Sequence, residues 1–179
     1  MKKQLLAFAL AAAPFVVFAS GVHARDFQSG VADQTCRVSV NGDAAHLSVQ
    51  LPTVSASALT TAGDTDGLTT FVLTISDCIV PLAVPQAIST AFAGNAVTTG
   101  GNLGGTGTAT NVALQLLDPP SSADPVDFTA SGGIHATNPV LQDGATSASH
   151  DLAVQYITEE GSASAGSVLN SVQYRMTYE

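Results

Sequence analysis

The stretch NSVQYRMTYE, residues 170–179, decides the fold class of this chain. Its apolar and aromatic side chains fall on every second position, at Val172, Tyr174, Met176 and Tyr178, with polar residues between them. This alternation is typical of a half-buried β-strand that turns one face to a core. The chain ends one residue after the pattern, so we expect a sheet whose last strand has no successor to pair with.

The same alternation recurs upstream, whereas helical periodicity is almost absent. Apolar residues two positions apart predict five further strands, at residues 38–40, 47–51, 71–75, 112–116 and 152–156. Turn-rich stretches separate them, among them TTAGDTDG, GGNLGGTGT and EEGSASAGS. Short strands at this spacing predict an all-β sandwich in a single domain.

The N-terminus has the features of a secretory signal peptide. Lys2 and Lys3 precede an apolar run at residues 5–18, which is too short for a spanning helix. Two cleavage sites compete, after Ala19 and after Ala24, and the local pattern slightly favours Ala24. With either cut we expect an exported protein.

Removal of the signal peptide leaves a strongly acidic chain. The full chain carries a net charge of −9, and the part after the signal holds three arginines and no lysine against fourteen carboxylates, a net −11. Such a surface repels phosphate backbones, so we expect no nucleic-acid partner. The two cysteines, Cys36 and Cys78, are expected to form one disulfide in an oxidising compartment.

Few residues suggest chemistry. The four histidines are far apart in sequence, with no metal-ligand spacing on one strand, and GDTDG at 63–67 is better explained as a polar turn than as a calcium loop. GGNLGGTGT at 100–108 does not match a phosphate-binding glycine pattern and predicts a flexible turn or a close backbone approach. We therefore expect no catalytic residue, no cofactor and no metal site.

Several segments together resemble one family. They are GTATNVALQLLD at 107–118, LAVQYI at 152–157, the pair Cys36 and Cys78, and the terminal VQYRMTYE. Phe27, nine residues before the first cysteine, fits the same pattern. The chain resembles the chaperone–usher fimbrial subunits, close to the major pilin of type 1 fimbriae.

This resemblance implies a fold and a function. The fold would be an incomplete immunoglobulin-like β-sandwich that lacks its final strand and is completed by a donor strand from a neighbouring subunit. The function would be that of a structural subunit of an adhesive fimbria, exported through the periplasm to the cell surface. Its partners would be related pilin subunits in a head-to-tail fibre, a periplasmic chaperone and an outer-membrane usher. The alternatives are a minor or adaptor pilin and, in a different class, a free-standing secreted β-sandwich that binds a ligand such as a carbohydrate.

The resemblance also divides the chain. Residues 1–19 would be the signal peptide, 20–35 the donor arm and 36–179 the pilin domain. A cut after Ala24 would leave only eleven residues before the first cysteine, so the family argument favours Ala19. The arm would donate through Val22, Ala24 and Phe27, with the inward phase left open.

The remaining residues with an implied role lie on the later strands. We expect the core or the acceptor groove to be lined by Val112, Leu114, Leu116, Leu152, Val154, Tyr156, Val172, Tyr174 and Met176. Tyr178, on the terminal strand, would dock the chaperone.

Overall fold

The regular secondary structure of the described residues is almost entirely β-strand. The computed structural model describes residues 36–78, 88–130, 134–137 and 144–178, all within one unit of the chain, Ala32–Glu179. Its strands are β1 (Arg37–Val40), β2 (Thr65–Ser76), β3 (Ile88–Gly94), β4 (Ala113–Leu117), β5 (Ile134–Thr137), β6 (Ala148–Ile157) and β7 (Val172–Tyr178). One short 3-10 helix, η1 (Ala56–Ala58), is capped by the Ser55 hydroxyl, which accepts a hydrogen bond from the backbone N–H of Ser57.

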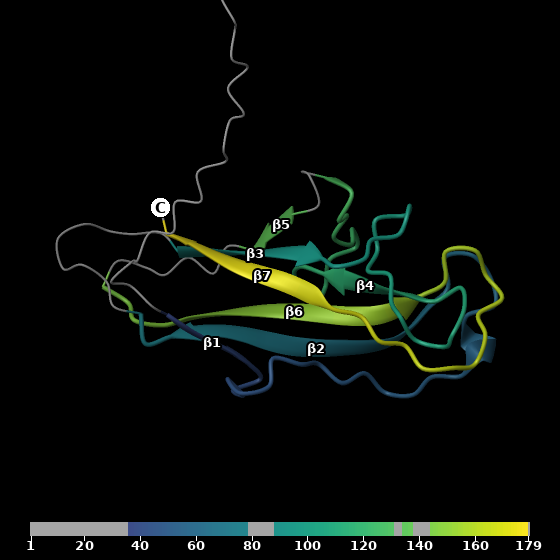
Figure 1. Cartoon of the computed structure of the whole chain (residues 1–179), viewed down its shortest axis with the longest axis horizontal. Coiled ribbons are helices and arrows are strands. Elements are labelled where there is room, and N and C mark those ends of the chain that lie inside the picture. Colours follow the sequence, from purple (N-terminus) through teal and green to yellow (C-terminus); the bar gives the residue numbers. More distant parts are fainter. Residues whose placement is uncertain (1–35, 79–87, 131–133, 138–143, 179) are drawn as a thin grey trace, which may run out of the picture. The chain divides into compact units, whose positions relative to one another are not determined.

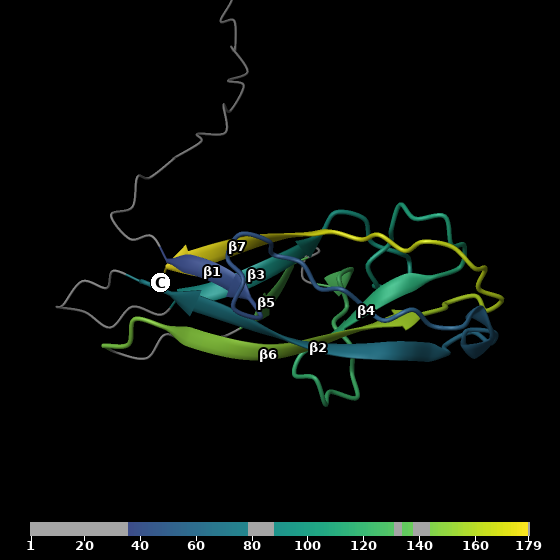
Figure 2. The ribbon, with the colours of Figure 1, turned by 90° about the horizontal axis from the view of Figure 1, so that it is seen from below.

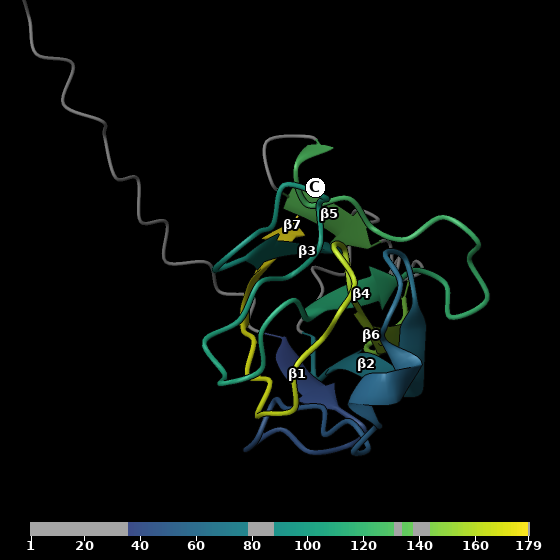
Figure 3. The ribbon, with the colours of Figure 1, turned by 90° about the vertical axis from the view of Figure 1, so that its right-hand side faces the viewer.

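The strands form two antiparallel sheets. One sheet has the order β1-β2-β6-β4 and the other the order β5-β3-β7. The two layers face each other (Figures 1 and 3), which gives the sandwich that the alternating strands predict. β1 and β7 are edge strands on one side of the sandwich, and β4 and β5 are edge strands on the other.

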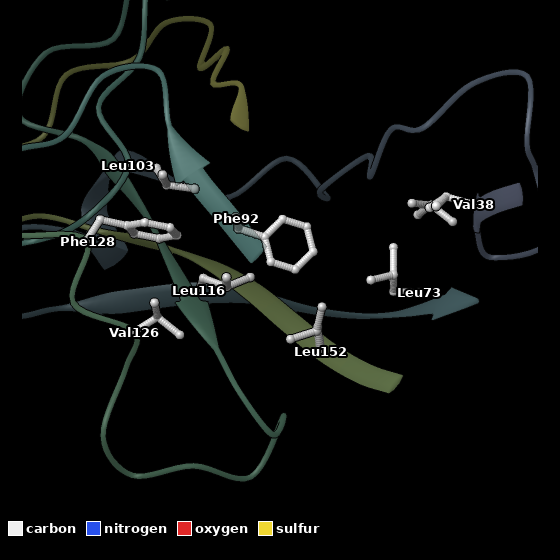
Figure 4. Close-up of a cluster of buried hydrophobic side chains, with 9 residues drawn as sticks. Val38, Leu73, Phe92, Leu103, Leu116, Val126, Phe128 and Leu152 are labelled. Atoms are coloured by element: carbon white, nitrogen blue, oxygen red, sulfur yellow. The ribbon is translucent and has the colours of Figure 1, made fainter. Parts of the chain in front are cut away.

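The core lies between the two layers because each strand turns its apolar positions inward. Phe92 of β3 lies among side chains of the opposite sheet, with Leu73, Leu116 and Leu152 around it (Figure 4). Leu152 is fully buried and Phe128 is 1% exposed. Burial of such side chains contributes roughly 1.5–3 kcal/mol each.

The disulfide expected between the two cysteines is present. Cys36 and Cys78 are joined across 42 positions, just before β1 and just after β2. β1 and β2 pair directly, with Val38 opposite Ile75. The bond therefore ties the first edge strand to the long central strand beside it.

Five of the predicted strands are found, and one prediction is wrong. Residues 47–51 are extended, but they pair with neither sheet. Their alternation has another cause, since Leu47, Val49 and Leu51 face the groove described below. An extended segment that lines an apolar groove has the same period of two as a strand in a sheet. The pattern alone therefore cannot distinguish a groove wall from a strand.

β3 and β5 are not predicted by the alternation of the sequence. In β3 the alanines at 91 and 93 occupy the positions that would be polar in a clear alternation, and β5 has only four residues. The GDTDG stretch is a turn in its first half, where the Asp64 carboxylate accepts hydrogen bonds from the backbone N–H groups of Thr60 and Thr61. Its second half belongs to β2, next to an irregularity in the pairing of β2 with β6.

Candidate functional site

An apolar groove runs between the two edge strands on one side of the sandwich. It has a volume of about 400 Å³. Its lining comes from both sheets and from two extended segments that flank them, and the lining residues carry no charged side chain. They are Val38, Val40, Leu47, Ser48, Val49, Leu51, Phe71, Leu73, Phe92, Leu103, Leu114, Leu116, Val154, Leu169, Asn170, Ser171, Val172 and Tyr174.

The groove exists because neither sheet is closed on this side. Among the described strands β1 pairs with β2 alone, and β7 pairs with β3 alone. No other described strand pairs with the outer edge of β7, whose backbone N–H and C=O groups on that side are therefore open to another strand along the groove. Figure 2 shows β1 and β7 at the same end of the molecule.

A second hollow continues the groove toward η1. It has a volume of about 380 Å³ and is lined by Thr53, Val54, Ala56, Leu59, Ala109, Val112, Tyr156 and residues 163–168. Its two walls follow directly in sequence from those of the first hollow, at 47–54 on one side and 163–174 on the other. Both segments run from η1 toward the β1–β7 end (Figure 2). The two hollows share no lining residue but lie between the same two segments of chain, and we call them together the β1–β7 groove.

The two walls of the groove are held differently. The 163–170 wall is hydrogen-bonded to residues 103–110, with the Thr106 N–H donating to the Leu169 carbonyl and the Ala109 N–H to the Ser167 carbonyl. A Cβ at Gly107 would collide with the Ser167 carbonyl oxygen, so the close backbone approach expected for this glycine-rich stretch is present.

The opposite wall, residues 47–54, has no such support. The only backbone–backbone hydrogen bond found for it among the described residues runs from the Ser48 N–H to the carbonyl of His46. The turn that leads into it is held by Asp43, whose carboxylate accepts hydrogen bonds from the backbone N–H groups of His46 and Ala45. These bonds, that of His46 first, lower the pKa of Asp43.

Exposed apolar surface concentrates at the groove. Eight large hydrophobic side chains among the described residues are exposed, and four of them line it: Leu47, Leu169, Val172 and Tyr174. Leu169 is 67% exposed. Apolar surface gathered in one channel, beside an unpaired strand edge, is typical of a site that another chain covers.

The structure brings most of the predicted groove residues together. Leu114, Leu116, Val154, Val172 and Tyr174 line the first hollow, and Val112 and Tyr156 line the second. Leu152 lies in the core instead, and Met176 packs against it from β7. The groove-lining residues that sequence reasoning did not assign include Leu47, Val49, Leu51 and Leu169, which lie on extended segments outside the ladders.

One predicted feature falls outside what the structure describes, and another is described in its backbone alone. The arm residues Val22, Ala24 and Phe27 lie outside the described residues. Tyr178 is the last residue of β7, and its backbone pairs with Ile88.

The described residues contain no group of three or more His, Cys, Asp or Glu side chains placed to hold a metal ion. No helix among them is long and apolar enough to cross a membrane. Among the features of the described residues, the groove is the one that indicates a binding partner.

Comparisons with known proteins agree on one family. The family described as "Fimbrial protein" matches residues 25–179. The chain is 37% identical to an F17 fimbrial protein of Escherichia coli, over 86% of this chain and 85% of that one. It is 34% identical to the major fimbrial subunit SMF-1 of Stenotrophomonas maltophilia strain K279a, over 94% of this chain and 99% of that one.

Solved structures support the fold. A subunit of a chaperone–usher pilus matches with a TM-score of 0.59 and 18% identity, over 95% of this chain and all of that one. The P pilus rod subunit PapA matches with a TM-score of 0.55 and 17% identity, over 80% and 99%. The expected fold is confirmed: the chain is an immunoglobulin-like sandwich of the pilin type, incomplete at the β1–β7 edge.

Proposed function

The chain belongs to the fimbrial protein family and is a structural subunit of a surface fimbrium; from this premise we propose that its subunits are joined by donor-strand exchange at the β1–β7 groove. The N-terminal arm, residues 20–35, of one subunit enters the groove of the next. The contact is head-to-tail and does not close on itself, so its product is a filament. This role requires no catalysis and no cofactor.

The observation that carries this proposal is the apolar groove at the place where a strand is absent. An extended segment laid in it would pair its backbone with the free edge of β7 and place every second side chain on the apolar floor. This is β-augmentation, of which donor-strand complementation of pilins is an established case. The exposed side chains of Leu47, Leu169 and Tyr174 would then be covered.

The length of the groove bears on where the signal peptide is removed. Its walls span residues 47–54 and 163–174. A donor strand that runs the length of these walls, with an extended rise of about 3.3 Å per residue, needs about eight to twelve residues. A cut after Ala24 leaves eleven residues before Cys36, and some of these must connect the arm to its own domain. A cut after Ala19 leaves sixteen, and we propose that site.

A subunit with an empty groove needs a temporary occupant. An exposed apolar channel beside an unpaired strand edge favours aggregation. We therefore assign a periplasmic chaperone to the groove before assembly and an outer-membrane usher to the exchange step. The free edge of β7, up to Tyr178, is where the chaperone would add its own strand.

The similarity to a major fimbrial subunit supports a repeated rod subunit over a minor or adaptor pilin. The shape of the groove also favours a strand over a carbohydrate or another compact ligand. It is elongated, and the residues that line its first hollow are apolar except for Ser48, Asn170 and Ser171. A sugar-binding site would need more polar groups than these.

A peptide experiment tests the proposal. Protein lacking residues 20–28 is refolded with a synthetic peptide of residues 20–34, and the soluble yield and thermal midpoint are measured. Both should rise, because a ligand that binds only the folded state stabilises it. A scrambled peptide of the same composition that works equally well would contradict strand insertion.

Two further peptides identify the inward phase of the donor strand. One carries Phe27→Asp and the other Gln28→Asp, which places the same charge on neighbouring positions of opposite phase. The change on the inward phase should abolish the stabilisation, and the other should leave most of it, because only the inward side chain leaves water. Equal effects of the two peptides would argue against an extended donor.

A further inference from the structure

The Cys36–Cys78 disulfide lies at the point where the N-terminal arm joins the sandwich. Cys36 directly follows the arm, residues 20–35, and Cys78 comes two residues after the end of β2. A pull on the arm therefore reaches Cys36 before any other described residue. From Cys36 the covalent chain offers two routes, one along β1 and one across the S–S bond to Cys78. The second route leaves out residues 37–77, which form a loop closed by the bond.

One wall of the β1–β7 groove lies inside this closed loop. The lining residues between the two cysteines come from β1, from β2 and from the segment that joins these strands. They are Val38, Val40, Leu47, Ser48, Val49, Leu51, Thr53, Val54, Ala56, Leu59, Phe71 and Leu73. The opposite wall, at 163–174, lies outside the loop, as does the rest of β7. The two walls therefore stay together under tension only if the closed loop stays in place.

The route along β1 is the weaker of the two. β1 has four residues and pairs with β2 alone. It continues through a tight turn at Asn41 and Gly42 into the 47–54 wall, which has a single backbone–backbone hydrogen bond among the described residues. Segments with few hydrogen bonds and few buried contacts open at the lowest cost in free energy. Tension along β1 would therefore remove Val38 and Val40 from the groove and then draw out the wall behind them.

The disulfide, by contrast, is anchored in both sheets. Cys78 is 4% exposed and forms a buried cluster with Ile75 of β2, which is fully buried. Ala148 at the start of β6 and Met176 of β7 pack against this cluster. A load that reaches Cys78 is therefore shared by the twelve-residue strand β2 and, through side-chain contacts, by β6 and β7. β7 is the strand whose open edge faces the groove.

We propose that the Cys36–Cys78 disulfide carries the tension of the arm past β1, so that a subunit pulled by one neighbour keeps its own groove closed on the donor arm of the other. While the bond is intact, residues 37–77 are off the covalent path of the load and their wall stays beside the donor. This inference rests on the proposed donor-strand exchange, because only then is the arm the point where the load enters.

Stretching of single fibres at constant force tests the proposal. Fibres are assembled with the disulfide intact and then reduced, so the test does not require a variant without cysteines to fold, and the mass of the subunit confirms the reduction. The lifetime of the subunit contact under load should fall by about tenfold or more, because a donor that loses Val38 and Val40 as neighbours loses buried apolar contact. Equal lifetimes before and after reduction would overturn the proposal.

The length gained on unfolding shows which route the load takes. A reduced subunit should lengthen by about 140 Å more than an oxidised one when it unfolds, since the 42 positions between the cysteines then join the load path at about 3.4 Å each. In reduced fibres this gain should begin before the donor is released, because β1 and the 47–54 wall yield first. Release of the donor with β1 still in place would also overturn the proposal.

A second attachment point separates the load path from the overall stability of the domain. The mature chain, with a peptide of residues 20–34 in its groove, is pulled between the peptide and either its own arm or an azide-bearing side chain in place of Ala123. Ala123 is exposed in the loop after β4 and lies outside the closed loop, so a pull there does not run along β1 with or without the bond. Reduction should shorten the lifetime of the peptide under a pull on the arm and leave it nearly unchanged under a pull at position 123. Equal shortening in both cases would mean that the bond acts through stability alone, and would overturn the proposal.

The same experiment distinguishes a failure of this inference from a failure of donor-strand exchange. A peptide that does not stay in the groove even without load would contradict the exchange itself. A peptide that binds, but whose lifetime under a pull on the arm is the same with and without the disulfide, would leave the exchange standing and contradict only the role of the bond.

Discussion

Two valines with the same exposure give the sharpest test of the groove. Val172 and Val97 are each 39% exposed, but Val172 lines the groove and Val97 does not. In a single subunit, a change to aspartate at either position leaves the new carboxylate in contact with water. In a fibre held by strand exchange, only the one at position 172 is covered.

The expected magnitude follows from what the donor strand covers. Removing the exposed 39% of a valine from water is worth about 0.6 kcal/mol, at the lower end of the range for full burial. Burying an unpaired carboxylate in its place costs several kcal/mol more. We expect Val172→Asp to weaken the subunit contact by about 3 kcal/mol or more, which is over a hundredfold in the equilibrium constant.

The assay is the release of monomers from purified fibres on heating, followed on a gel without boiling. Val172→Asp should give few fibres, and those should release monomers at a much lower temperature. Val97→Asp should behave nearly like the unchanged protein. Val172→Thr, which keeps the branched shape suited to a strand, should fall between them. If both aspartate variants gave fibres of equal heat resistance, the groove would not be the subunit contact.

Four further predictions follow from single features of the fold. Reduction of the Cys36–Cys78 disulfide should add two hydrogens to the mass and, in the chain-entropy model, lower the free energy of unfolding by about 4 kcal/mol; free thiols in the exported protein would contradict this. Leu114→Asp should abolish accumulation of the subunit on immunoblots, because the side chain packs against the core; normal export and assembly of this variant would contradict that placement. Gly107→Ala should displace the 163–170 wall and reduce peptide insertion, since its Cβ would meet the Ser167 carbonyl; unchanged insertion would contradict the close approach. Deletion of residues 175–179 should prevent co-purification of a chaperone, because it shortens the free edge of β7; an unchanged complex would contradict that docking site.

The strands that pack one apolar face into the core were readable from the sequence. Leu73 and Ile75 of β2, and Leu152 and Val154 of β6, fall on every second position and are buried as expected. β3 was not readable because alanines fill its alternate positions, and no local pattern marks them as strand. A period of two indicates that one side of an extended segment is covered. It does not indicate whether the segment is a paired strand of a sheet or the wall of a groove.

The groove itself was only partly predictable for the same reason. Leu47, Val49 and Leu51 alternate as a strand would, yet they line a groove with no ladder beside them. The contacts of the Asp118 carboxylate with Nε2 of His135 and Nε2 of His150 could not be predicted at all, because the two histidines are fifteen residues apart and meet only when the strand register is set. Spacing in the sequence can show that side chains on one strand lie close together. These three side chains come from β5, from β6 and from the residue that follows β4.

Removal of the arm tests the central claim most directly. A chain that lacks the arm upstream of Ser29 keeps its own groove but has lost its donor, so it should fold, bind a chaperone and occupy no position except the end of a fibre. Electron microscopy of cells that make only this chain should find no long filaments, while cells that make the full chain should show them. Long filaments built from the arm-deleted chain would contradict donor-strand exchange.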